Sequence, residues 1–84
     1  MALFAAIKVG EPLQPVMLTL ESVASVDENG RNGLHLCAIH GRLWATLDLC
    51  VAGCCPVQAD DHGILPAGYA RAGWPGSGIK KMLT

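Results

Sequence analysis

Three cysteines and a histidine are the residues of this chain best suited to metal or redox chemistry. Cys50, Cys54 and Cys55 lie close together, and His62 follows them. Thiolates and imidazole are ligands that zinc prefers in proteins. The spacing departs from the paired ligands of structural zinc sites, and reduced cysteine also packs as a small apolar side chain. The simpler prediction is therefore that the protein has no cofactor, with zinc binding or redox chemistry at these four residues as the alternative.

A second group of residues comes together only if the chain folds as predicted below. Glu21, His35 and Asp48 would then share one face of a β-sheet. A carboxylate beside an imidazole raises the imidazole pKa and fixes its tautomer, which suits a general base. Mixed faces of this kind are more typical of solvated sheet surfaces or subunit contacts. We therefore predict no catalytic residue, and keep a small-ligand or enzymatic site at this trio as an alternative.

The charge balance excludes some classes of partner. Six basic residues are scattered along the chain against seven acidic ones, giving a net charge of −1. Nucleic-acid binding depends on a basic field that this composition does not supply. No apolar run approaches the ~20 residues that span a bilayer, and the first residues lack the basic start of a secretory signal. We expect a soluble, cytoplasmic protein without nucleic-acid or membrane partners.

Alternating apolar and polar residues predict four β-strands, at residues 3–9, 16–27, 34–39 and 42–51. Short turns join the last three, so the predicted fold is mainly β, a small antiparallel meander of sandwich or barrel type. Leucines at 43 and 47 also repeat at helical spacing, and a helix over residues 42–52 would make the fold α+β. We expect one domain over residues 1–79, a flexible tail at 80–84 and no internal repeat.

Two aspartate-rich turns are predicted in more detail. A three-residue loop over residues 28–30 would pair Asp27 with Arg31 and require a left-handed conformation at Gly30. The segment Asp60-Asp61-His62-Gly63 is typical of an exposed turn in which aspartate accepts hydrogen bonds from the backbone.

The predicted sheet also leaves apolar side chains on its second face, which need cover. An apolar patch on a small protein commonly marks an interaction site. The residues predicted for the interaction surface are Met17, Ile39 and Trp44 on this face, together with Trp74, which lies apart from the sheet between turn-forming residues. The sequence therefore favours a small, intracellular, non-enzymatic protein-interaction module, a homodimer that binds or inhibits another protein.

Overall fold

The computed structural model describes residues 2–69, and all regular structure in that range is helical. The elements are α1 (Ala2–Val9), a 3-10 turn η1 (Pro15–Met17), α2 (Leu20–Ala24), α3 (Gly33–His40), α4 (Leu43–Val51) and α5 (Pro66–Tyr69). The predicted mainly β meander is therefore wrong. The α+β alternative is also wrong, because its helix over residues 42–52 is present but no strand accompanies it in residues 2–69.

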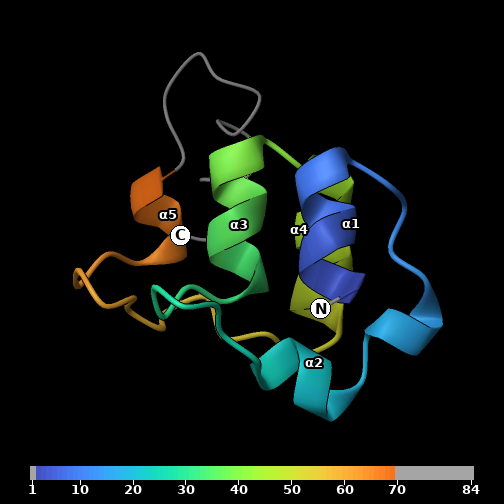
Figure 1. Ribbon diagram of the computed structural model, residues 1–84, viewed down its shortest axis with the longest axis horizontal. Helices are drawn as coiled ribbons and strands as arrows, with labels where there is room; N and C mark the ends of the chain where they lie inside the picture. The colour runs from blue at the N-terminus through green and yellow to red at the C-terminus, as the bar shows by residue number, and fades with distance from the viewer. Residues whose placement is uncertain (1, 70–84) are drawn as a thin grey trace.

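Helix α3 lies at the centre of the molecule (Figure 1). It packs against α1 on one side and α5 on the other, while α4 contacts it from a second layer. Every residue from 32 to 38 is buried. Leu34 and Cys37 of α3 form one core with Leu3 and Ile7 of α1 and with Leu49 of α4.

Local hydrogen bonds define the two ends of α3. The Asn32 side chain accepts hydrogen bonds from the backbone N–H groups of Leu34 and His35, at 3.0 and 3.1 Å. In return His35 Nδ1 accepts the backbone N–H of Asn32 at 3.0 Å, which completes a capping box. Gly41 ends the helix in a left-handed conformation, with φ 68°. These caps set the length of α3 at eight residues.

The buried side chains of α4 do not follow the alternating pattern of the predicted strand. Thr46 and Leu49, three residues apart, are its buried side chains. Leu43, Leu47 and Val51 are exposed on the opposite side. A spacing of three to four residues between buried positions is that of a helix packed on one side.

The structure contains a repeated loop, so the expectation that the chain has no internal repeat is wrong. We call residues 27–31 the first Asp loop and residues 60–64 the second Asp loop. In each, the aspartate N–H donates to the carbonyl oxygen four residues later, at 2.9 and 3.0 Å. In each, the glycine N–H donates to the aspartate carbonyl at 3.0 Å, and the glycine has a φ of 74° or 75°.

The helices repeat together with these loops. Asp27 and Asp60 are 33 residues apart, as are the first residues of α3 and α5, Gly33 and Pro66. Helix α1 has eight residues, like α3, and also leads into a left-handed glycine, Gly10. The order within one unit is therefore Asp loop, helix, glycine turn and second helix. Residues 27–59 form the complete unit among the residues that the structure describes.

Candidate protein-interaction surface

The first Asp loop is organised by the Asp27 carboxylate. Its Oδ1 accepts the backbone N–H groups of Asn29 and Arg31, both at 2.9 Å. Its Oδ2 accepts Arg31 Nε–H at 3.0 Å, which forms a part-buried ion pair. Desolvation alone would raise the pKa of Asp27, but these hydrogen bonds and the Arg31 charge lower it below its usual value. The predicted backbone pairing of Asp27 with Arg31 and the left-handed Gly30 are confirmed, but the β-hairpin that this loop was predicted to close is wrong, because no strand flanks the loop in residues 2–69.

The second Asp loop uses Asp60 in the same way. Its Oδ1 accepts the backbone N–H groups of His62 and Ile64, both at 2.9 Å, and its Oδ2 accepts the Tyr69 hydroxyl. Burial alone would raise the pKa of Asp60, but the three hydrogen bonds prevail and lower it to about 2. The bond to Asp60 also raises the pKa of Tyr69. The predicted aspartate turn is therefore confirmed.

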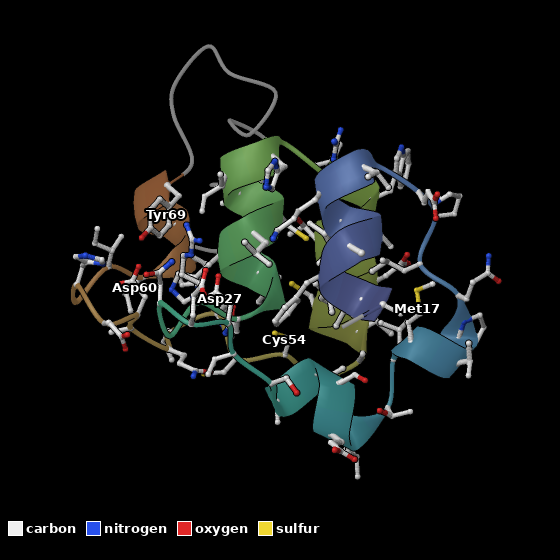
Figure 2. All side chains as sticks on the ribbon, in the orientation of Figure 1. Met17, Asp27, Cys54, Asp60 and Tyr69 are labelled. Atoms are coloured by element: carbon white, nitrogen blue, oxygen red, sulfur yellow. The ribbon has the colours of Figure 1, made fainter. Side chains whose placement is uncertain are left out.

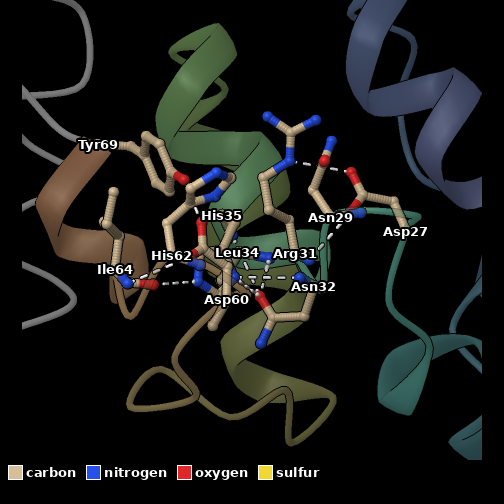
Figure 3. A network of polar contacts seen from close by, with 10 residues as sticks. All are labelled: Asp27, Asn29, Arg31, Asn32, Leu34, His35, Asp60, His62, Ile64 and Tyr69. Atoms are coloured by element: carbon tan, nitrogen blue, oxygen red, sulfur yellow. Dashed lines mark hydrogen bonds and ion pairs between the residues drawn. The ribbon is translucent and has the colours of Figure 1, made fainter.

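The two loops are joined to each other and to α3 (Figure 3). Asp61 N–H donates to the Asn29 carbonyl at 3.0 Å, and His35 Nε2–H donates to the Ile64 carbonyl at 2.8 Å. Since a carbonyl oxygen only accepts, Nε2 of His35 carries the proton of this bond, while Nδ1 lies 3.0 Å from the Asn32 backbone nitrogen and 2.9 Å from Asn32 Oδ1. A buried imidazole therefore couples the start of α3 to the following loop.

A further contact holds the segment between the loops. Asn32 Nδ2 donates to the Cys55 carbonyl at 2.9 Å and to Gln58 Oε1 at 3.2 Å. Within residues 2–69, every buried side-chain nitrogen and oxygen has a hydrogen-bond partner. The buried polar side chains of the two loops therefore stabilise the fold.

The tips of the loops are exposed. Glu28 lies at the tip of the first, and Asp61 and His62 lie at the tip of the second. Figure 2 shows Asp27 and Asp60 beside α3, on the side away from Met17. The exposed polar residues of the two Asp loops therefore lie on backbone segments that internal hydrogen bonds hold in place.

The structure does not bring Glu21, His35 and Asp48 together. His35 is completely buried between α3 and the second Asp loop. Glu21 is exposed on α2 and Asp48 is exposed on α4. No hydrogen bond within residues 2–69 joins any two of the three. Sequence reasoning placed His35 on an open sheet face, whereas the capping box turns it into the core.

The cysteine cluster is divided between surface and core. Cys50 and Cys55 are exposed and Cys54 is buried, and all three are free thiols. Partial desolvation raises the pKa of the Cys50 thiol, and burial raises that of Cys54. His62 lies at the exposed tip of the second Asp loop. Residues 2–69 contain no group of three or more metal-ligating side chains, and zinc binding stays a prediction.

The predicted interaction residues differ in their availability. Met17 and Ile39 are partly buried and pack against the core. The Trp44 side chain is 77% exposed at the start of α4. Trp74 lies outside the described residues, as does the predicted tail at 80–84. Trp44 is therefore the described member of this set with a free aromatic side chain.

A groove that sequence reasoning missed lies beside Trp44. It has a volume of about 520 Å³ and runs between the segment after α1 and the start of α4. Ile7, Leu13 and Leu43 supply apolar lining, and Glu11, Trp44 and Asp48 also line it. Residues 10–13 follow α1 and residues 42–48 follow α3, and a left-handed glycine, Gly10 or Gly41, lies where each of these helices ends.

No known protein family, curated protein or solved structure was found to match this chain. In residues 2–69 no helix combines the length and apolar character needed to cross a membrane. The functional argument therefore rests on the geometry of the loops, helices and groove.

Proposed function

We propose that this protein is a non-enzymatic protein-binding module built from ankyrin-type repeats. A period of 33 residues, with a turn followed by two helices, is the organisation of ankyrin repeats. Residues 27–59 have this order, and residues 60–69 begin it again. The ankyrin pattern Thr-Pro-Leu-His, aligned at residues 32–35, has leucine and histidine where this chain has Leu34 and His35. Aligned 33 residues later, it has proline where this chain has Pro66.

One observation carries the proposal, namely the pair of bonds that link successive units. Asp61 N–H reaches the Asn29 carbonyl, and His35 Nε2–H reaches the Ile64 carbonyl. Such nearest-neighbour contacts stack repeats into a continuous body with an extended binding surface. His35 takes part in this stacking directly, while the Asp60 carboxylate is bound within its own unit by the backbone of its loop and by the Tyr69 hydroxyl. This arrangement favours recognition over catalysis.

The loop tips supply the contact residues of the proposed module. Glu28, Asp61 and His62 are exposed, while the aspartates beneath them hold the backbone. Contact residues on loops positioned by a rigid scaffold are a common arrangement for binding. Two exposed carboxylates favour a partner surface that carries basic side chains.

Photo-crosslinking in cells tests this function. A crosslinking amino acid at position 28 or 62 should capture the same protein, and the same amino acid at exposed Val16 should not capture it. The double variant Glu28→Lys, Asp61→Lys should weaken binding of that captured protein at least tenfold. Glu21→Lys, an equal charge change on α2, is the control and should leave binding unchanged. Equal capture from all three positions would overturn the proposal.

A second proposal is self-association through α4. Leu43, Leu47 and Val51 are exposed and spaced four residues apart, so they form one apolar stripe. Native mass spectrometry of the full chain should show a homodimer. Leu47→Asp should convert the dimer to a monomer, and Val16→Asp, at an exposed residue of η1, should leave it intact. A monomeric wild-type protein contradicts this proposal without affecting the first.

A further inference from the structure

We propose that the groove between α1 and α4 binds a lysine or arginine side chain of a partner polypeptide. Its recognition residues are Trp44, Glu11 and Asp48, which line the groove. The proposal rests on the proposed function only in that the partner is a protein. It concerns a surface at the glycine turns, distinct from the Asp loops.

The floor of the groove suits an aliphatic chain. Ile7 is completely buried beneath it, and Leu13 and Leu43 form its sides. A volume of about 520 Å³ lies within the ~300–1,000 Å³ typical of ligand pockets. Lysine and arginine bury a methylene stem along apolar surface while keeping their charge in water. A basic side chain can therefore lie along this floor with its charged end at the rim.

The rim of the groove attracts a cation. Trp44 is 77% exposed, and an indole face binds ammonium or guanidinium groups through its quadrupole. Glu11 and Asp48 add two exposed carboxylates. Within residues 2–69 the ion pair present is Arg31 with Asp27, so neither groove carboxylate is paired there.

Arg42 also lines the groove, but its guanidinium is already bound. Nε–H donates to the Ile7 carbonyl at 2.9 Å and Nη2–H to the Lys8 carbonyl at 3.0 Å. These are carbonyls at the end of α1, where a cation is favoured by the helix dipole. The guanidinium also packs against Gly10, where an added Cβ would lie 3.0 Å from Cζ. Arg42 therefore holds the wall of the groove and keeps its positive charge. Because Glu11 and Asp48 carry two negative charges against this one, these three side chains leave a net charge of −1 at the groove.

The test uses three short peptides and the full-length protein labelled with ¹⁵N. The probes are acetyl-Leu-Lys-Leu-amide, its arginine analogue and an uncharged analogue with norleucine in place of lysine. The lysine and arginine peptides should shift the Trp44 indole signal, assigned with Trp44→Phe, and the amide signals of residues 11 and 48. Their affinity should exceed that of the norleucine peptide at least fivefold and should fall with added salt.

Variants locate the charge selectivity. Glu11→Gln combined with Asp48→Asn should abolish the preference for lysine over norleucine, while Glu21→Gln should retain it. Circular dichroism should confirm that both variants remain folded. Equal binding of lysine and norleucine peptides, or lysine-induced shifts confined to the Asp loops, would overturn the proposal. A captured partner that depends on Glu28 and Asp61 would support the proposed function even in that case, so the two failures are distinguishable.

Discussion

Two aspartate side chains determine the local backbone of this protein. Asp27 and Asp60 each accept two backbone N–H groups with one carboxylate oxygen and a side-chain donor with the other. A carboxylate that accepts several hydrogen bonds has a lowered pKa. Both groups therefore link folding to pH in the same direction.

We expect Asp60→Asn to change the acid dependence of stability. The pKa of Asp60 is about 2 in the folded protein and about 3.9 in an unfolded chain. The stabilisation from this carboxylate is therefore complete above the unfolded value and is lost as pH falls toward the folded value. The variant should be less stable at pH 7 and should lose less stability between pH 4 and pH 2, as measured by urea unfolding. A dependence on pH as steep as that of the wild type would contradict this, and Asp61→Asn serves as the matched control.

At the scale of elements, the position of α3 explains why its helical character was missed. Residues 34–39 read as an alternating strand, yet all but the last are buried because α1, α4 and α5 surround the helix. A helix buried on all sides has no polar stripe from which a period could be read. The helix signals are instead at its ends, in the Asn32–His35 capping box and at Gly41.

His35→Ala tests how α3 is joined to the second Asp loop. The substitution removes the acceptor for the Asn32 N–H and the donor to the Ile64 carbonyl, and it leaves space in the core. We expect a loss of about 2–4 kcal/mol in the free energy of unfolding. The control His62→Ala, at an exposed loop tip, should stay within about 0.5 kcal/mol of wild type. Unchanged stability in the first variant would contradict a structural role for His35.

At the scale of the whole molecule, successive units are held together where the two Asp loops touch. Gly30 faces Asp61 of the next unit, whereas no atom of residues 2–69 would lie within 4 Å of a Cβ at Gly63. Both glycines have a left-handed backbone, with φ 74° and 75°. Both positions therefore require a residue that tolerates a positive φ. Within residues 2–69, Gly30 alone of the two also contacts the neighbouring unit.

This difference predicts unequal effects of two alanine substitutions. Gly63→Ala should cost about 1–2 kcal/mol, because an alanine Cβ is strained in the left-handed region. Gly30→Ala should cost more, since its Cβ would also lie 3.0 Å from the Asp61 backbone nitrogen and would clash with the Asp61 carboxylate. Thermal unfolding of both variants measures the difference. Equal losses would contradict stacking through this contact.

The two Asp loops were predictable from the sequence. The pairing of Asp27 with Arg31, the left-handed Gly30 and the aspartate turn at Asp60 each depend on hydrogen bonds within five residues of sequence. The helices between these loops became evident only from the tertiary structure. Because α3 is buried on all sides, its sequence lacks the helical period of apolar and polar residues. The tertiary structure also decided where the candidate sites lie, turning His35 inward and joining residues 10–13 to residues 42–48 in one groove. Contacts between residues far apart in the chain depend on packing, and local patterns do not encode them.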